Sequence, residues 1–174
     1  MNKRISKVLV PALATVVALG ALAGGTPAAA ARSTRLVACC QPDVRVSTFG
    51  DNIYGTDGTN QVKVVKIAAG KSQIVHFQVE NDGAPQDQPT VQAGAGAGVF
   101  HVTYTNEFDV NVTSDMESGY VPGTYYPTAW FGFRMNIKIA KSAKHGKHHD
   151  FLINASSGAT PSLVDAVIVR ATVK

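Results

Sequence analysis

The densest group of side chains that could do chemistry lies near the C-terminus. One segment carries three lysines and three histidines: Lys141, Lys144, His145, Lys147, His148 and His149. Imidazole nitrogens and the nearby carboxylate of Asp150 are groups that can coordinate zinc or copper. The lysines repel a cation, however, and neighbouring histidines at the start of a strand point to opposite faces. We therefore expect no bound metal or other cofactor here, but either a solvated basic loop or a surface for an anionic partner.

A second polar segment is acidic. Calcium takes about 6–8 oxygen ligands, and five residues offer them: Glu107, Asp109, Asn111, Asp115 and Glu117. The spacing D-x-[DN]-x-[DN]-G of a calcium-binding loop is absent from the segment. A polar loop with surface carboxylates is the simpler interpretation, and calcium binding stays open as the alternative.

The aromatic residues gather in one stretch: Tyr120, Tyr125, Tyr126, Trp130, Phe131 and Phe133. Exposed rings of this kind stack on the apolar C–H faces of sugars. The alternation that begins at Trp130 places Phe131, Phe133 and Met135 in a core, and Trp130 on the outer face or at an end of the fold. Trp130 is thus the candidate for contact with a glycan, with core packing as the alternative for its neighbours.

The sequence contains none of the common enzyme motifs. It has no G-x-S-x-G nucleophile turn, no H-E-x-x-H zinc motif and no Walker phosphate loop. Gly94, Gly96 and Gly98 lie between β-type segments, whereas a phosphate-binding glycine loop connects a strand to a helix. We expect a protein that is not an enzyme and that has no catalytic residues.

Two adjacent cysteines, Cys39 and Cys40, precede the first predicted strand. The stretch from Leu36 to Cys39 resembles a lipoprotein cleavage box, but Arg32 and Arg35 separate it from the apolar run. A disulfide between neighbouring residues is strained. An intermolecular disulfide, which would link two chains into a dimer, and free thiols are the interpretations that we prefer.

The first 31 residues have the parts of a secretory signal peptide. Basic residues up to Lys7 precede an apolar run from Val8 to Ala23, and Ala30 and Ala31 offer cleavage sites. The run is shorter than the about 20 residues of a membrane span, so we expect a secreted or cell-surface protein without a transmembrane segment. Cleavage would leave 13 Lys and Arg against 12 Asp and Glu, and a nucleic-acid partner is not expected.

Beyond the signal we expect a flexible lead over 32–41 and one domain over 42–174. Alternation from Val75 to Glu80 has the period of a strand with one buried face. The same pattern predicts strands at 42–47, 61–67, 73–80, 87–92, 99–105, 108–113, 130–140, 151–155 and 165–173. The doubled valine at 64–65 predicts a bulge or a fully covered position, and no segment shows helical periodicity. These strands predict an all-β, two-layer antiparallel sandwich, with a barrel as the alternative.

Short motifs along this domain add a resemblance. V-E-N-D-G at 79–83, Q-P-D-V at 41–44, the turn at 69–72 and D-A-V at 165–167 resemble the motifs of bacterial immunoglobulin-like modules related to cell-adhesion domains. The resemblance implies an immunoglobulin-like β-sandwich of about seven to nine strands, used outside the cell for adhesion, spacing or carbohydrate contact. It implies no catalytic residues. The sequence departs from the family pattern at 106–130.

Together these patterns predict a secreted, non-catalytic binding module. The expected partner is an extracellular surface polymer, glycan or protein, which would contact the six basic residues of 141–149 or, for a glycan, Trp130. A secreted inhibitor of an extracellular enzyme, acting through the turn-rich loop 114–127, is the alternative function. An exported metal-binding protein is a weaker one.

Overall fold

The computed structural model describes residues 40–46 and 54–174. They lie in the unit Leu36–Lys174 of a chain that divides into two units. The described residues form the strands β1 (Pro42–Val46), β2 (Val62–Ile67), β3 (Ser72–Asn81), β4 (Thr90–Ala93), β5 (Phe100–Asn106), β6 (Trp130–Ile139), β7 (His148–Ser156) and β8 (Val164–Val173). Between β5 and β6 lies one short helix, α1 (Thr113–Ser118).

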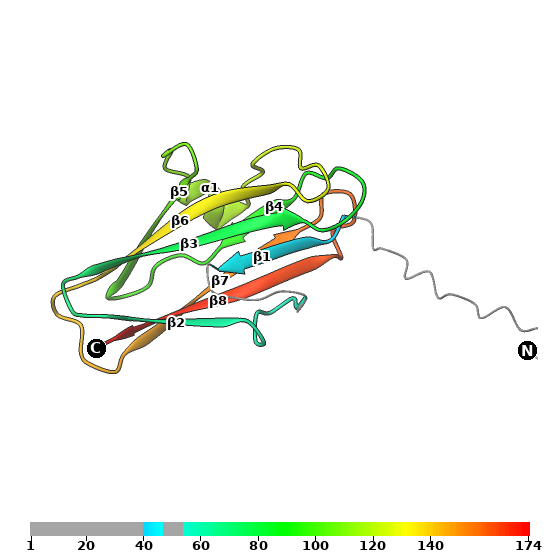
Figure 1. Ribbon diagram of the computed structural model, residues 1–174. Coiled ribbons are helices and arrows are strands. Elements are labelled where there is room, and N and C mark those ends of the chain that lie inside the picture. The colour runs from blue at the N-terminus through cyan, green and yellow to red at the C-terminus, as the bar shows by residue number, and fades with distance from the viewer. Residues whose placement is uncertain (1–39, 47–53) are drawn as a thin grey trace, which may run out of the picture. The chain divides into compact units, whose positions relative to one another are not determined.

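The strands form two four-stranded sheets that enclose one core (Figure 1). Sheet A has the strand order β1-β3-β6-β5, and sheet B has the order β2-β8-β7-β4. If β2 is set aside, these orders are the A-B-E-D and G-F-C sheets of an immunoglobulin domain. The predicted immunoglobulin-like sandwich of about seven to nine strands is therefore confirmed.

One strand pair departs from the predicted antiparallel arrangement. β2 runs parallel to β8, in continuous register from Val62 to Ile67. The bulge considered at the doubled valine is therefore absent. Val64 is 50% exposed and Val65 is partly buried, because β2 is an edge strand whose outer face is open to water.

Alternating side chains build the core between the sheets. Val75, Phe77 and Val79 of β3 are buried, as their alternation predicts. Phe133 and Met135 of β6 are buried too, and Phe77 lies in register with Phe133 at a ring-centroid distance of 5.0 Å. Removal of such apolar surface from water stabilises the fold by about 25 cal/mol per Å². Because these residues point inward, their neighbours on β3 and β6 point outward.

The two sides of the sandwich are closed in different ways. On one side, the main-chain N–H of Val44 in β1 donates to Asp165 of β8 at 2.7 Å and links sheet A to sheet B. On the other side, the segment 107–129 runs from β5 to β4, where Tyr120 pairs with Val91. The segment 107–129 is thus a side wall of the sandwich.

The strand predicted at 108–113 is wrong. A turn, with Asp109 at a φ of 62°, leads from β5 toward α1, which begins at Thr113. Six residues are too few for a helical period to stand out in the sequence. The short helix depends on tertiary packing, since its Met116 is fully buried in the core.

Two other strands have bounds that differ from the prediction. β4 begins at Thr90 rather than at Asp87, because Pro89 has no N–H for a ladder and Asp87 makes only an isolated bridge to Tyr125. β7 begins at His148, earlier than the apolar residues suggest, because His148 pairs with Thr172 of β8. Polar residues at strand ends carry no apolar alternation and so escape a sequence pattern.

The predicted signal peptide at 1–31, the lead at 32–39 and Cys39 lie outside the described residues. Cys40, which we expected in the flexible lead, is fully buried. Its main chain packs so closely on Gly83 that a Cβ at Gly83 would overlap it. Among the described residues, no helix has the length and apolar character to cross a membrane.

Candidate functional site

The outer face of sheet A has a gap where a side chain is missing. Arg45 of β1 pairs with Gln78 of β3, and Gln78 pairs with Gly132 of β6, so the three positions form one row. The register of β5 on β6, continued by one residue, places Glu107 on the other side of Gly132. Since glycine has no side chain, this row contributes none between Gln78 and Glu107.

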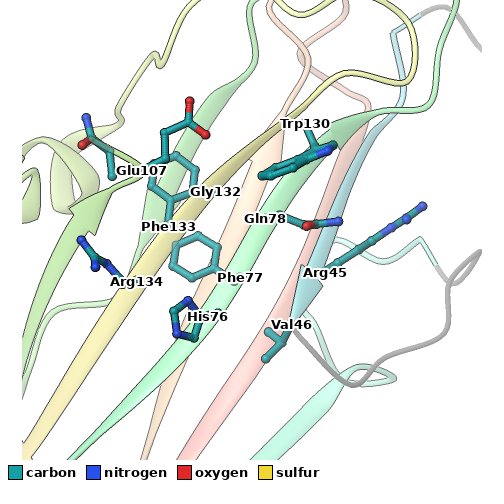
Figure 2. Close-up of a pocket in the computed structure, with 11 residues that line it drawn as sticks. Arg45, Val46, His76, Phe77, Gln78, Glu107, Trp130, Gly132, Phe133 and Arg134 are labelled. Carbon is teal, nitrogen blue, oxygen red and sulfur yellow. The ribbon is translucent and has the colours of Figure 1, made fainter. Parts of the chain in front are cut away.

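Two large side chains bound this gap along β6. Trp130 and Arg134 lie two positions before and after Gly132, and therefore on the same face of the sheet. Trp130 is 56% exposed, and a Cβ built on Gly132 would lie 3.2 Å from its Cζ3 atom. The six-membered ring of Trp130 thus reaches over the glycine and forms an aromatic wall (Figure 2).

These residues line an open hollow of about 560 Å³, together with Val46, His76, Phe77, Asn106 and Phe133. A volume of this size lies within the about 300–1,000 Å³ of small-ligand sites. Figure 2 shows the hollow across β1, β3 and β6, with Trp130 and Glu107 at its two sides. We call it the Gly132 hollow. Its lining combines one large aromatic ring with amide, guanidinium, imidazole and carboxylate groups.

Arg45 enters the hollow from a network of acids. Its guanidinium lies 2.6 Å from Asp43, 2.9 Å from Glu80 and 3.9 Å from Asp82. The hydroxyl of Tyr54 donates to Asp82 at 2.6 Å. Burial, and then this hydrogen bond to a carboxylate, raise the pKa of Tyr54 above its usual value. The network holds the guanidinium of Arg45 in one place and neutralises its charge.

Among the described residues, these three acids form the group that most resembles a metal site. Oxygen atoms of Asp43, Glu80 and Asp82 lie within 4.8 Å of one another. The guanidinium of Arg45 binds all three of them, so the structure gives this trio a cation already. Within the described residues, no comparable group forms among the histidines of 141–149 or the acids of 107–117.

Arg134 and Glu107 are held less firmly. Arg134 forms an ion pair with Asp109, but their side chains are 39% and 75% exposed, so the pair is worth little. Glu107 has no ion-pair or hydrogen-bond partner among the described residues. Both side chains are therefore available to a ligand in the Gly132 hollow.

Asp165 anchors the strand that carries Arg45. It is fully buried and accepts hydrogen bonds from the N–H groups of Val44, at 2.7 Å, and Gly55, at 3.1 Å. The side-chain amide of Gln61 donates a third bond at 3.3 Å. Burial raises the pKa of Asp165 to about 6, although the backbone N–H groups act in the opposite direction.

The predicted basic residues lie beyond the other end of β6. Lys141, Lys144, His145 and Lys147 are exposed in the loop that joins β6 to β7. The N–H of Gly146 donates to the carbonyl of Val173, and the N–H of Val173 donates to the carbonyl of Lys147, so β8 holds this loop. At about 3.3 Å per residue, the ten residues of β6 separate the loop from Trp130 by about 30 Å.

The two histidines that begin β7 do not act together. His148 is exposed and pairs with Thr172, while the ring of His149 stacks on Phe100 at 5.7 Å and meets Phe151 edge-on at 4.6 Å. A ring nitrogen of His149 lies 3.2 Å from the carbonyl oxygen of Ala95. The ring of His149 thus packs against two aromatic residues, and contact of the six basic residues with an anionic partner remains a prediction.

The loop 114–127, a predicted inhibitory segment, is fixed at two points. The backbones of Tyr120 and Tyr125 pair with Val91 and Asp87. Between and beside these points, Val121 and Tyr126 are 51% and 67% exposed. The inhibitory role of this segment stays a prediction.

Sequence reasoning found Trp130 but missed the residues around it. Its outward position agrees with the alternation of β6, yet Gln78, Gly132 and Arg134 were not expected to form a site. One signal was present, because an isolated glycine inside a strand marks a close approach of a ligand or another group. The strand registers that bring β1, β3 and β5 close to Gly132 of β6 cannot be predicted from any local sequence pattern.

The comparisons place no family name on this arrangement. The chain matches no protein-family model, and no curated protein matches its sequence. A family 123 glycoside hydrolase from Clostridium perfringens is similar in structure, with a TM-score of 0.45 and 9% identity, over 76% of this chain and 27% of the hydrolase. The chain thus corresponds to about a quarter of that enzyme.

Two smaller proteins are similar over nearly their whole length. The N-terminal domain of PorA has a TM-score of 0.45 and 13% identity, over 77% of this chain and 98% of that domain. The PapD-like domain 7 of human CEP192 has a TM-score of 0.38 and 10% identity, over 75% and 96% of the two chains. Likeness at this level gives no argument about function.

Proposed function

We propose that the chain is an exported, non-catalytic binding module that takes a saccharide in the Gly132 hollow. One observation carries the proposal, namely the exposed indole of Trp130 beside a gap in the outer face of sheet A. An aromatic ring offers a flat apolar surface to the C–H face of a sugar ring. The gap at Gly132 gives that sugar room to lie against the sheet.

The polar groups around the gap support the same function. Gln78 and Arg134 present planar groups with several donors, and Glu107 presents acceptors, at three sides of Gly132. Ligand sites combine apolar walls with a few polar groups that fix orientation. The rigid strands beneath these side chains limit the conformational entropy lost on binding.

The remaining parts of the proposal rest on the sequence. Export is inferred from the signal-like residues 1–31, and a non-catalytic role from the absence of enzyme motifs. Adhesion to an extracellular polymer is the role that a saccharide site on such a module would serve.

Replacement of Trp130 tests the saccharide site. We expect Trp130→Ala to weaken binding to neutral polysaccharides at least about tenfold, because truncation of a central aromatic contact costs about 2 kcal/mol or more. Affinity electrophoresis against a panel of neutral polysaccharides, followed by calorimetry on the best ligand, measures the effect. Tyr126→Ala removes another exposed ring, which lies outside the lining of the hollow, and is the matched control.

Two results would overturn the proposed function. One is a wild-type protein that binds no member of the panel. The other is a Trp130→Ala variant that binds as tightly as the wild type, with the same thermal unfolding curve. Equal losses from Trp130→Ala and Tyr126→Ala would also count against the hollow, because they would indicate a general effect of exposed aromatic rings.

The basic loop is the site of a second candidate function, contact with an anionic polymer. The observation that favours it is the fixed backbone of the loop, from which Lys144, His145 and Lys147 project into solvent. Positive charge on a fixed surface raises the local concentration of an anionic partner. A salt-sensitive interaction with a polyanion, lost on replacement of these side chains, would support it.

A further inference from the structure

We propose that the Gly132 hollow selects saccharides that carry a protonated amine, and that Glu107 binds the ammonium group. The proposal rests on the proposed function, because it names the ligand class of the same site. It follows from the place of Glu107 beside the gap, from its lack of a partner, and from the charges that surround the hollow.

The first step is the position of Glu107. It follows β5 directly, at the position that lies beside Gly132 on β6. In Figure 2 the carboxylate of Glu107 stands on one side of Gly132 and the indole of Trp130 on the other. A sugar ring that stacks on Trp130 over the gap therefore brings a substituent of its far edge toward Glu107.

The second step is the availability of charge. Each guanidinium in the hollow already has a carboxylate partner, since Arg45 binds Asp43 and Glu80, and Arg134 binds Asp109. Glu107 is the lining carboxylate for which the described residues supply no cation. An incoming ammonium group would complete its pairing, and a charge-assisted hydrogen bond of this kind is stronger than a neutral one.

The third step is the total charge around the hollow. Two guanidinium groups, those of Arg45 and Arg134, are accompanied by five carboxylates: Asp43, Glu80, Asp82, Glu107 and Asp109. The sequence places no lysine or arginine between Lys71 and Arg134 that could offset them. A surface with this excess of acid attracts cations and repels uronates, sulfated sugars and phosphates.

Two groups in the hollow act against an ammonium ion. Arg134 lies on β6 two positions from Gly132, and His76 pairs with it on β3. Both are on the side away from Trp130, in the row after the gap. The carboxylate of Asp109 offsets part of the repulsion between Arg134 and an ammonium group at Glu107, and solvent and salt screen the rest because both side chains are exposed.

The aromatic wall favours the same ligand class. In an oligosaccharide that carries an amine on each sugar, a second ammonium group near the indole face of Trp130 gains a cation–π attraction of about 0.5–2 kcal/mol. A neutral sugar keeps the stacking contact alone, and an acidic sugar meets repulsion from Glu107. The hollow should therefore rank amine-bearing saccharides first, neutral ones second and acidic ones last.

Matched oligosaccharides test this order. At about pH 6 and low salt, where alkyl amines are protonated, we expect deacetylated chito-oligosaccharide to bind at least about tenfold more tightly than its fully N-acetylated counterpart. Oligogalacturonide should bind more weakly than both. Calorimetry with the whole chain measures the three affinities.

Glu107→Gln keeps the shape of the side chain and removes its charge. We expect this variant to lose the preference for the amine, so that the two chito-oligosaccharides bind within about threefold of each other. Its affinity for the N-acetylated ligand should stay the same. Glu117→Gln changes the same charge on the exposed face of α1 and should keep the wild-type ratio.

The outcomes separate this inference from the proposed function. If wild type binds neutral ligand through Trp130 but shows no preference for the amine, the saccharide site stands and the role of Glu107 is wrong. A preference that survives Glu107→Gln, or a preference for oligogalacturonide, overturns the inference in the same way. If no ligand binds, both proposals fail.

Discussion

The two regions that could bind a partner lie at the two ends of β6. One is formed by side chains from several strands, and the other by a single loop. At one end, the Gly132 hollow places an aromatic wall, a guanidinium and a carboxylate around an absent side chain. At the other end, Lys144, His145 and Lys147 project from a loop that backbone hydrogen bonds hold to β8. The difference shows that residues adjacent in sequence and residues brought together by strand register form different kinds of surface.

The two regions should also differ in how they bind. For a neutral sugar, the hollow offers apolar contact and hydrogen bonds on rigid strands, and these contacts change little with salt. The loop offers exposed charge, whose attraction falls as the ionic strength shortens the Debye length to about 8–10 Å.

The largest effect is expected when the gap itself is filled. Gly132→Val suits a strand and places two methyl groups where we propose that the sugar ring lies. The new Cβ would lie 3.2 Å from Cζ3 of Trp130 and displace the indole slightly. We expect saccharide binding to fall by about 30-fold or more, measured by calorimetry.

Asn136→Val is the matched control for this change. Asn136 is an exposed residue of the same strand, and it lies beyond Arg134 and outside the lining of the hollow. Wild-type affinity in Asn136→Val and loss in Gly132→Val would locate binding at the gap. Unchanged binding in a folded Gly132→Val variant would show that the saccharide does not bind in the Gly132 hollow.

The second effect concerns the buried anchor at the hollow's end of the fold. Burial raises the pKa of Asp165 to about 6 from a usual value of 3.8. The folded state therefore holds the proton more tightly than the unfolded state in this window, and stability decreases as the pH rises from about 4 to about 6. Asp165→Asn removes this titration, so the difference in unfolding free energy between wild type and variant should change by about 2 kcal/mol across the window.

Asp150→Asn should change the pH dependence of stability in the opposite direction. A hydrogen bond from Arg170 lowers the pKa of Asp150, so its contribution is present above its usual pKa and is lost as the pH falls. Because both side chains are exposed, this effect should be small. Urea denaturation at several pH values measures both variants. Parallel pH profiles for wild type and Asp165→Asn would show that Asp165 is not the titrating group.

Much of the fold could be predicted because apolar and polar residues alternate along its strands. The inward side chains of β3 and β6 were assigned from period two alone, and the turns between strands from glycine, proline and polar residues. The helix α1 and the parallel pairing of β2 with β8 could not be predicted in this way. Both depend on contacts between distant parts of the chain, such as the burial of Met116.

The candidate site was predictable only in part, for a related reason. The alternation gives the direction of Trp130, but not the strands that lie beside it. Gln78 and Glu107 meet the gap at Gly132 only through the registers of β3 and β5 on β6. Local patterns did indicate the basic loop, because its residues are neighbours in sequence, but they did not indicate that the ring of His149 packs on Phe100 and Phe151.

The smallest effect is expected at the basic loop. Lys144→Ala with Lys147→Ala removes two exposed charges without disturbing the backbone bonds of the loop. We expect the affinity for a polyanion such as heparin to fall by about two- to fivefold at low salt, and the difference to vanish near physiological salt. Retention on a heparin column at several salt concentrations measures it.

The double variant Lys63→Ala with Lys66→Ala is the charge-matched control, because it removes two lysines from the edge strand β2. If both double variants lose the same retention, the interaction depends on net charge, and the basic loop has no role of its own. A loss confined to Lys144→Ala with Lys147→Ala would make the loop a second, salt-sensitive site. In that case saccharide binding at the Gly132 hollow should be unchanged, because about 30 Å of β6 separates the two regions.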